Sequence, residues 1–242
     1  RNHLLNRVKS YEDFTRNVPV NTYEELKTDI DRMRHGEHNV LCQGGVKWYA
    51  KSSGTTNDKS KFIPVSHEGL QRIHYQGGKD VVALYLRNHP HSRLFDGKSL
   101  ILGGSHAPNY NLPGSLVGDL SAILIENINP LANIARVPCK QTALLSDFEV
   151  KRDRIARETM HKNVTNLSGV PSWMLSVLVR VMELSGKQHL EEVWPNLEVF
   201  FHGGIAFTPY RGQYEKLIAS PKMSYMETYN ASEGFFGIQS DP

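Results

Sequence analysis

Residues 52–61 read Ser52-Ser53-Gly54-Thr55-Thr56-Asn57-Asp58-Lys59-Ser60-Lys61 and follow an apolar segment at residues 46–50. The first five of these residues are small, so their backbone N–H groups stay accessible, and four of the five carry a hydroxyl. Turns that expose N–H groups form nests for anions, and a nearby lysine adds a point charge. The stretch therefore predicts a loop that wraps a polyphosphate, although the same residue types also dominate ordinary solvated turns.

This loop is not a Walker A loop. That pattern requires G-x-x-x-x-G-K-[ST], and no second glycine precedes a Lys-Ser or Lys-Thr pair here. Asn57 makes the sharpest turn of the loop less permissive than a glycine would, although asparagine tolerates a positive φ better than most residues. The loop alone leaves the kind of phosphate site open.

Two later segments narrow the choice. Residues 199–207 read Val-Phe-Phe-His-Gly-Gly-Ile-Ala-Phe, and residues 226–237 read Met-Glu-Thr-Tyr-Asn-Ala-Ser-Glu-Gly-Phe-Phe-Gly. A hydroxyl-rich loop with a lysine, an apolar strand that ends in Gly-Gly, and a Tyr-x-x-Ser-Glu motif occur here in that order. The ordered set resembles the acyl-adenylate-forming superfamily.

The resemblance extends to one family within that superfamily, the auxin-responsive acyl-acid amido synthetases (Gretchen Hagen 3). The pieces that carry it are Lys-Ser-Tyr-Glu-Asp-Phe at residues 9–14, Val-Pro-Val-Asn-Thr-Tyr-Glu-Glu at residues 18–25, a phosphate loop one residue longer than in acyl-CoA ligases that runs on into Phe62-Ile63-Pro64, and Gly-Val-Pro-Ser-Trp at residues 169–173. Together with the Tyr-Asn-Ala-Ser-Glu terminus they span essentially the whole chain.

The resemblance implies a layered α/β fold, with a mainly parallel sheet and flanking helices, as part of the large N-terminal domain of an adenylate-forming enzyme. The activity implied is ATP-dependent activation of a carboxylic acid as acyl-AMP, followed by amide formation with an amino acid. ATP and Mg²⁺ are the cofactors implied. Family members continue beyond this point with a ribose-binding aspartate and a small C-terminal closing domain. We therefore expect residues 1–242 to be a partial domain that is inactive alone.

Each site residue receives a role by position in the family motifs. Ser52, Ser53, Gly54, Thr55 and Thr56 would hold the ATP phosphates. Lys61 is the first choice for the catalytic lysine of this loop and Lys59 the second, and a solvated lysine is the alternative for either.

The two later motifs supply the rest of the nucleotide site. Gly203 and Gly204 would let the backbone approach the adenine, as glycine does wherever a ligand touches the main chain. Tyr229 would stack on the base, Ser232 would bond the α-phosphate, and Glu233 would be catalytic and hold the magnesium, since Mg²⁺ prefers hard oxygen ligands. The alternatives are a plain turn for the glycines, a core tyrosine and a solvated glutamate.

The acyl pocket is assigned to a segment on the same strand edge: Gly169, Val170, Pro171 and Trp173, with the loop at residues 103–116 as a second candidate. Trp173 lies on a helix that is apolar nearly all round, which we expect to be buried, so a core position is its alternative. His202 could touch the substrate, but a buried histidine with its hydrogen bonds satisfied is the preferred interpretation.

Composition excludes several classes of protein. The chain has 28 basic and 25 acidic residues, too small an excess for nucleic-acid binding, and no apolar run of membrane-spanning length. Its two cysteines, Cys42 and Cys139, are far apart, which favours reduced thiols in a cytoplasmic protein. The pairs His35/His38 and His89/His91 lack further metal ligands nearby. Residues 151–154, Lys-Arg-Asp-Arg, are interpreted as a solvated helix face.

Helical patterns alternate with short apolar strands, which indicates a parallel α/β sheet. Predicted strands end at residues 50, 102, 201 and 228, and each runs into small polar residues. In open α/β sheets ligands bind at the carboxyl ends of the strands, so these ends are expected to share one edge. Residues 105–116 are expected to be a loop. Ser146 is expected to cap the helix that begins directly after it.

Two other functions remain open from the sequence. An acyl-CoA ligase shares the adenylation step, although the longer phosphate loop and the N-terminal motifs count against it. A non-catalytic nucleotide-binding domain would keep the fold without turnover. In each case the expected ligands are small molecules, not nucleic acid or a membrane.

Overall fold

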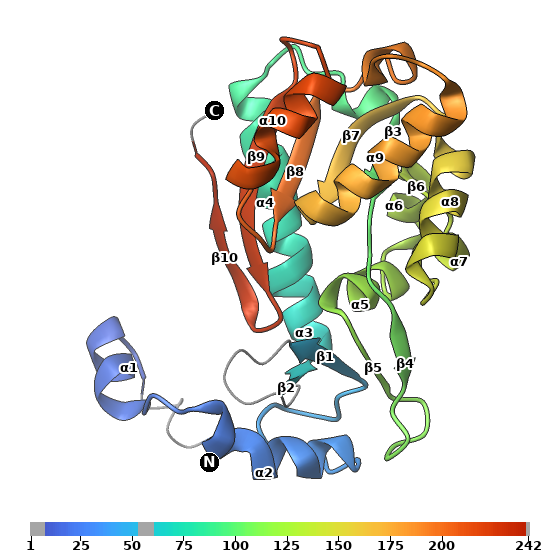
Figure 1. Cartoon of the computed structure of the whole chain (residues 1–242). Coiled ribbons are helices and arrows are strands. Elements are labelled where there is room, and N and C mark those ends of the chain that lie inside the picture. Colours follow the sequence, from blue (N-terminus) through green and yellow to red (C-terminus); the bar gives the residue numbers. More distant parts are fainter. Residues whose placement is uncertain (1–7, 53–60, 241–242) are drawn as a thin grey trace.

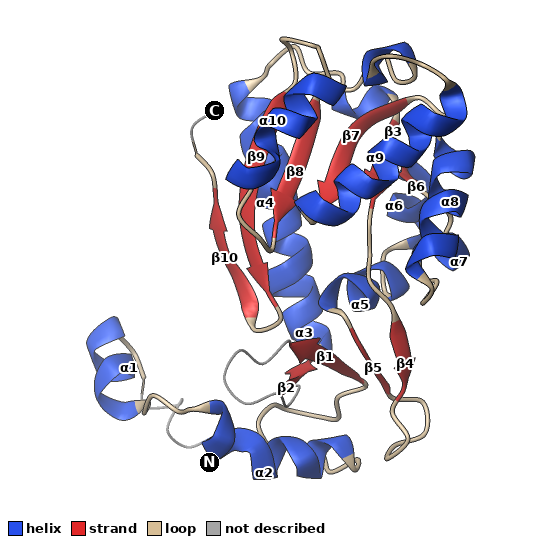
Figure 2. Cartoon of the chain, in the orientation of Figure 1, coloured by secondary structure: helices blue, strands red, loops and turns tan. Residues whose placement is uncertain are grey.

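A computed structural model describes residues 8–52 and 61–240 of the chain. A large sheet forms the upper part of the molecule, and a small sheet lies below it beside the N-terminal helices (Figure 1). Helices α9 and α10 cover the front face of the large sheet and α4 runs behind it, so the upper part has three layers (Figure 2). The layered α/β architecture expected from the sequence is confirmed.

Six strands of the described residues form the large sheet, in the order β10-β9-β8-β7-β3-β6. All neighbouring strands in this sheet run parallel except β10, which pairs antiparallel with β9. Their bounds are β3 Lys98–Ile101, β6 Arg136–Val137, β7 Val164–Gly169, β8 Val199–Gly203, β9 Ser224–Ala231 and β10 Gly234–Ile238. The carboxyl ends of β3, β7, β8 and β9 therefore lie on one edge. This confirms the shared edge for the predicted strand ends at residues 102, 201 and 228, but not for the one at residue 50.

The small sheet corrects the sequence-based picture. Within the described residues it has the order β2-β1-β5-β4, with β1 Trp48–Ser52, β2 Lys61–Val65, β4 His106–Pro108 and β5 Leu116–Gly118. The strand before the phosphate loop is thus one arm of an antiparallel hairpin in a second sheet, and it does not belong to the parallel sheet. The expectation of a plain loop at residues 105–116 is wrong at its two ends, where β4 lies and β5 begins. Each of these strands has three residues, too few to show an alternating pattern.

The helices follow the capping signals closely. Ser10 and Ser66 accept hydrogen bonds from the first turns of their helices, and Thr22 forms a capping box with Glu25. The expected cap at Ser146 is wrong by one residue, since Asp147 accepts from the Val150 N–H. The bounds are α1 Tyr11–Asn17, α2 Tyr23–Arg34, α3 His67–Gly69, the π-helical turn η2 Leu70–His74, α4 Tyr75–Asn88, the 3₁₀ turn η3 Leu94–Asp96, α5 Leu120–Glu126, α6 Pro130–Ala135, α7 Lys140–Ala143, α8 Phe148–Thr159, α9 Pro171–Ser185, the 3₁₀ turn η4 Leu190–Glu192 and α10 Thr208–Leu217.

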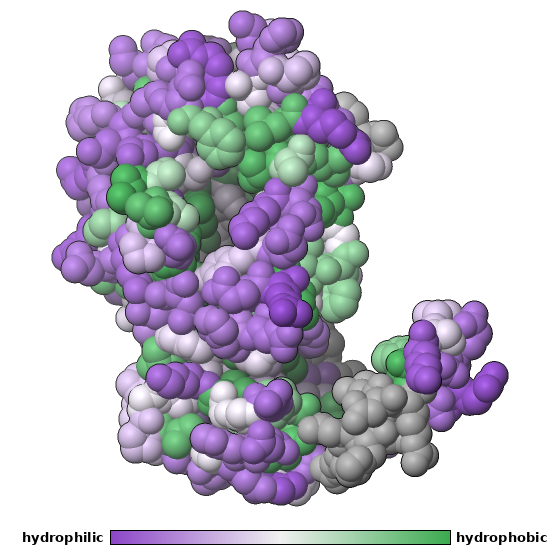
Figure 3. Space-filling model, turned by 180° about the vertical axis from the view of Figure 1, so that it is seen from behind, coloured by the Kyte–Doolittle hydropathy of each residue, from purple (hydrophilic) through white to green (hydrophobic). Residues whose placement is uncertain are grey.

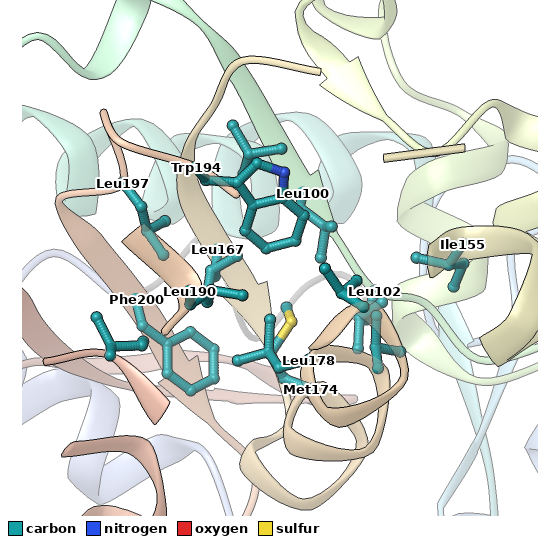
Figure 4. Packing of buried hydrophobic residues seen from close by; sticks show 14 of the residues in the cluster. Leu100, Leu102, Ile155, Leu167, Met174, Leu178, Leu190, Trp194, Leu197 and Phe200 are labelled. Atoms are coloured by element: carbon teal, nitrogen blue, oxygen red, sulfur yellow. The ribbon is translucent and has the colours of Figure 1, made fainter. Parts of the chain in front are cut away.

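The main core lies between the large sheet and helices α8, α9 and α10. Figure 4 shows Leu100, Leu167 and Phe200 from the strands packed against Met174 and Leu178 of α9, with the Trp194 ring beside them. Trp194 is fully buried, and its indole N–H donates to the Thr159 carbonyl at 3.1 Å. Burial of a large ring whose polar atom keeps a hydrogen bond stabilises the fold without a desolvation penalty for that atom.

The opposite face of the sheet has a smaller core. Val81 and Tyr85 of α4 pack there against Val199, Phe201 and Met226. Among the described residues, α4 covers this face together with Leu94 of η3. The view from behind shows hydrophobic surface on the upper part of the molecule between hydrophilic residues (Figure 3). The α4 packing is therefore the main contact that shields β8 and β9 from behind.

One continuous helical stretch, from α3 through η2 to α4, reaches both sheets (Figure 1). Leu70 at its beginning packs with Ala50 and Val65 of the small sheet. Further along, Gly77 lies so close to β10 that a Cβ atom there would meet the Phe235 Cγ at 2.4 Å. The stretch therefore joins the sheet of the phosphate loop to the β9–β10 hairpin.

This close approach gives a matched pair of substitutions. Gly77→Ala should lower the free energy of unfolding by about 1–3 kcal/mol, because the added methyl overlaps the base of the Phe235 side chain. Gly78→Ala, the next residue of the same helix, meets nothing within 4 Å and should raise it by up to about 1 kcal/mol, because alanine favours the helix. Urea titration of both variants measures the difference, and similar effects at the two positions would contradict the contact.

Candidate nucleotide-binding site

Glycines mark the carboxyl ends of two neighbouring strands. Gly169 at the end of β7 pairs with His202, and Gly203 at the end of β8 pairs with Thr228. A Cβ atom on Gly203 would lie 2.3 Å from the Thr228 carbonyl oxygen, so no side chain fits there. Gly204 has a φ of +85°, a conformation that glycine adopts without strain. The edge thus exposes backbone where the sequence predicted contact with a base.

The β9–β10 hairpin carries Tyr229, Ser232 and Glu233. Tyr229 is 63% exposed, which excludes the alternative of a core tyrosine, and its ring lies 5.3 Å from that of Phe236. Ser232 and Glu233 form the turn between the two strands, and Glu233 is exposed. The hairpin extends β9 beyond its last partner on β8, the Gly203–Thr228 pair. An aromatic face and a carboxylate are therefore available just past the glycine edge.

The phosphate loop is described only at its two ends. Ser52 and Lys61 pair across the β1–β2 hairpin, while Ser53, Gly54, Thr55, Thr56 and Lys59 lie outside the described residues. The Lys61 ammonium lies 5.6 Å from the centroid of the Tyr23 ring of α2. The Tyr23 hydroxyl in turn accepts a hydrogen bond from the Phe62 N–H at 2.9 Å. Helix α2 therefore supports the strand that leaves the loop.

The segment assigned to the acyl pocket adjoins the same edge. A Cβ atom added to Gly204 would lie 3.4 Å from Val170 Cγ2, so Gly204 and Val170 are in contact range. Pro171 is buried and its carbonyl accepts from the Tyr214 hydroxyl at 2.8 Å. Trp173 is 41% exposed and lies against Phe148, which excludes the core alternative for this residue. Helix α9 is accordingly buried on one side only, contrary to the expectation of full burial.

A buried lysine at this edge was missed. Lys151 was interpreted as part of a solvated helix face, yet it is only 6% exposed. Its ammonium donates to the carbonyls of Gly103 and Gly104 at 3.0 and 2.9 Å, just after β3. Burial lowers the pKa of Lys151, and the nearby Asp119 opposes that shift. Lys151 stands next to three other charged residues in the Lys-Arg-Asp-Arg run, so the sequence does not show that its side chain points inward. Only a narrow stripe of α8 faces the core, and Lys151 lies on it.

His202 occupies the base of the glycine turn. It is 3% exposed, and its ring stacks on Phe207 at 4.2 Å between centroids. Its Nδ1 is buried and makes no hydrogen bond within the described residues, so the expectation of a satisfied histidine is wrong for this atom. Burial lowers the pKa of His202 to about 4, with a smaller contribution from the Arg211 charge. The imidazole is thus neutral near pH 7.

The donor set is compatible with a magnesium that is bound mainly through phosphates. Among the described residues no group of three or more His, Cys, Asp or Glu side chains could hold a metal ion. Magnesium usually keeps several waters and binds one or two carboxylates together with substrate phosphates. One exposed carboxylate at Glu233 fits that mode of binding, whereas a dedicated protein cage for the metal has no counterpart in the described part of the chain.

A separate hollow of about 310 Å³ lies at the other end of β9. Residues that line it include Tyr85, His89, Arg211 and Tyr225. Ser224, the first residue of β9, also lines it, so the hollow is at the amino end of the strand and the candidate residues are at the carboxyl end.

No helix in the described ranges is long and apolar enough to cross a membrane.

Solved enzyme structures share this fold. The AtGH3.15 acyl acid amido synthetase in complex with 2,4-DB superposes with a TM-score of 0.76, covering 100% of this chain and 51% of that chain at 19% identity. An open conformation of 2-hydroxyisobutyryl-CoA ligase with 2-HIB-AMP and CoA gives a TM-score of 0.52, covering 94% of this chain and 46% of that chain at 11% identity. The fold is that of the N-terminal domain of adenylate-forming enzymes.

Residues 1–223 match the GH3 family N-terminal domain, so the chain belongs to the GH3 family. Indole-3-acetic acid-amido synthetase GH3.15 of Arabidopsis thaliana is 37% identical over 100 residues, which are 40% of this chain and 16% of that protein. Indole-3-acetic acid-amido synthetase GH3.6 of the same plant is 33% identical over 73 residues, 30% of this chain and 12% of that protein. The chain spans about half the length of the GH3.15 structure that it matches. The predicted family is confirmed.

The low pKa of His202 makes stability depend on pH. Above pH 6.5 the residue is neutral in both folded and unfolded chains and has no effect. Between pH 6.5 and about 4 the unfolded chain binds a proton that the folded chain does not, so stability should fall by up to about 3 kcal/mol as the pH drops through this window. Urea titrations at several pH values should show a shallower fall for His202→Phe. The exposed His161 provides the control, since His161→Gln should leave the wild-type profile unchanged.

Proposed function

We propose that the whole protein activates a carboxylic acid with ATP as acyl-AMP and then transfers the acyl group to the amine of an amino acid. The observation that carries this proposal is the position of Gly203, Gly204, Tyr229 and Glu233 on one strand edge of a GH3 family fold. Relatives of this family are named indole-3-acetic acid-amido synthetases. Which acid and which amino acid the protein uses is left to experiment.

The first step joins two anions, so the site has to neutralise charge and align the attack. The acid carboxylate attacks the α-phosphorus, a new C–O–P link forms, and pyrophosphate leaves with the electrons of the broken P–O bond. Positioning and electrostatics supply most of the catalysis in phosphoryl-type transfers. Such a reaction needs a flat binding surface for the base, donors for the phosphates and a hard-ligand carboxylate for a divalent cation.

The described residues suit these tasks. The exposed Tyr229 ring offers a stacking surface for adenine, and Gly204 would let the backbone approach the base because it has no side chain. Base stacking on an aromatic ring is worth about 1–3 kcal/mol in nucleic-acid complexes. Ser52 and Ser232, together with residues 53–56 outside the described part of the chain, would hold the phosphates. Glu233 would hold Mg²⁺, which neutralises phosphate charge when bound. In the second step the amine nitrogen attacks the acyl carbon, AMP leaves, and the ammonium proton is lost to solvent or a base.

The acyl group would lie against residues 169–173. Val170 adjoins Gly204 and Gly169 pairs with His202, so an acid there would meet the α-phosphate of a nucleotide stacked on Tyr229. The indole of Trp173 is exposed at the start of α9. We propose that a ribose-binding aspartate and a small closing domain, which lie outside residues 1–242, complete the site. Free Cys42 and Cys139 are in keeping with a reducing, cytoplasmic setting.

An acyl-CoA ligase is the second candidate, because 2-hydroxyisobutyryl-CoA ligase has the same fold at a lower TM-score. A non-catalytic nucleotide-binding domain is the third. Exchange of labelled pyrophosphate into ATP by the full-length protein, tested with a panel of acids, separates an enzyme from a binder. A product assay with amino acids or CoA then separates amide from thioester formation. No exchange with any acid, although ATP binds, would leave the third candidate.

Two charge-removing variants test the assigned roles. Lys61→Ala and Glu233→Gln in the full-length protein should each reduce the exchange rate by about a hundredfold, the usual cost of about 3 kcal/mol for one lost charge-stabilising contact. The matched controls are Lys79→Ala on the exposed side of α4 and Glu227→Gln, an exposed carboxylate of β9. Both controls should keep the wild-type rate. Wild-type exchange in Lys61→Ala or Glu233→Gln would refute the role of that residue.

A further inference from the structure

A partly buried hydrogen bond joins the helical stretch after the phosphate loop to the Tyr-Asn-Ala-Ser-Glu motif. His74 Nδ1 lies 3.0 Å from the side-chain oxygen of Asn230, although the two residues are 156 positions apart. Since an amide oxygen only accepts, His74 donates from Nδ1. His74 is 5% exposed and Asn230 is half-buried, so the bond is shielded from water at its histidine end. Without Asn230 the buried imidazole N–H would have no partner among the described residues, which favours keeping the bond closed.

The backbone around His74 supports a purpose beyond packing. Residues Leu70–His74 form a π-helical turn between α3 and α4, and such turns occur frequently at functional sites. Leu70 opens the turn and packs on Val65 of β2, while His74 closes it and contacts β9. One turn of helix therefore connects the strand that leaves the phosphate loop with the strand that carries Tyr229.

Asn230 lies between the residues that the proposed function uses. Tyr229 precedes it on β9, and Ser232 and Glu233 follow it in the turn. Because side chains alternate along a strand, the Asn230 side chain points to the face opposite Tyr229, toward the helix. A bond at Asn230 thus restrains the strand without occupying the face that Tyr229 presents.

We propose that the His74–Asn230 hydrogen bond sets the position of Tyr229 and Glu233 relative to β2, the strand that leaves the phosphate loop, so that His74 and Asn230 are positioning residues for ATP. This inference rests on the proposed function. It assigns the two residues no contact with substrate. Their effect is to hold base-binding and phosphate-binding elements, which belong to different sheets, at a constant separation.

The test measures acid-dependent exchange of pyrophosphate into ATP in the full-length protein, with His74→Ala, Asn230→Ala and the double variant. Each single variant should lower kcat/KM for ATP about tenfold, the effect of one partly buried hydrogen bond with a partner left unpaired. The double variant should lose little more, since both substitutions remove the same bond. The loss should appear as a higher KM for ATP while the KM for the acid stays at its wild-type value. A general loss of folding would instead lower kcat and leave both KM values unchanged.

Two further variants keep the test decisive. His74→Gln retains an N–H donor of similar reach and should recover part of the ATP dependence lost in His74→Ala. His67→Ala removes an exposed histidine from the same helical stretch and should behave as wild type. Wild-type kcat/KM for ATP in Asn230→Ala, or losses that add in the double variant, would overturn the inference while leaving the proposed function intact. A wild-type protein without exchange would remove both.

Discussion

The helical stretch from α3 through η2 to α4 is the constraint on which the arrangement of this protein depends. Its first turn packs into the core of the small sheet, and its later turns cover the back of the large sheet. A helix is stiff over this length, so it transmits position from one sheet to the other. Gly77 against Phe235 and His74 on Asn230 add contacts with the β9–β10 hairpin.

The candidate site is consequently composite. The hydroxyl-rich loop belongs to an antiparallel hairpin of the small sheet, and the glycine edge with Tyr229 belongs to the parallel sheet. Each part is built by ordinary local rules, namely hairpin pairing in one case and strand ends that converge in the other. In the proposed function, this combination would let one element hold phosphates while another holds a base. Lys151 donates to the carbonyls of Gly103 and Gly104 after β3, and the His202 ring packs on Phe207 below the glycine turn.

Much of this could be predicted from sequence because the relevant signals are local. Ser10, Thr22 and Ser66 cap the helices that follow them, and α9 lies between Pro171 and Gly186, so these boundaries depend on single residues at the helix ends. Apolar strands that end in small residues indicated a parallel sheet with one ligand edge. The ordered motifs predicted the GH3 family, which the match over residues 1–223 confirms. The roles of Lys61, Tyr229 and Glu233 come from the same motifs and stay predictions.

The sequence by itself determined the fold class, the family and the order of the candidate motifs, because these depend on short-range patterns of polarity and backbone preference. Only the tertiary structure decided that β1 and β2 form a separate sheet, that Lys151 points inward and that His74 reaches Asn230. Strand partners, the inward position on a charged helix and a bond across 156 residues depend on which surfaces meet after folding. No local sequence pattern encodes these contacts, since the residues near each position in the sequence would be the same whichever distant residue it contacted.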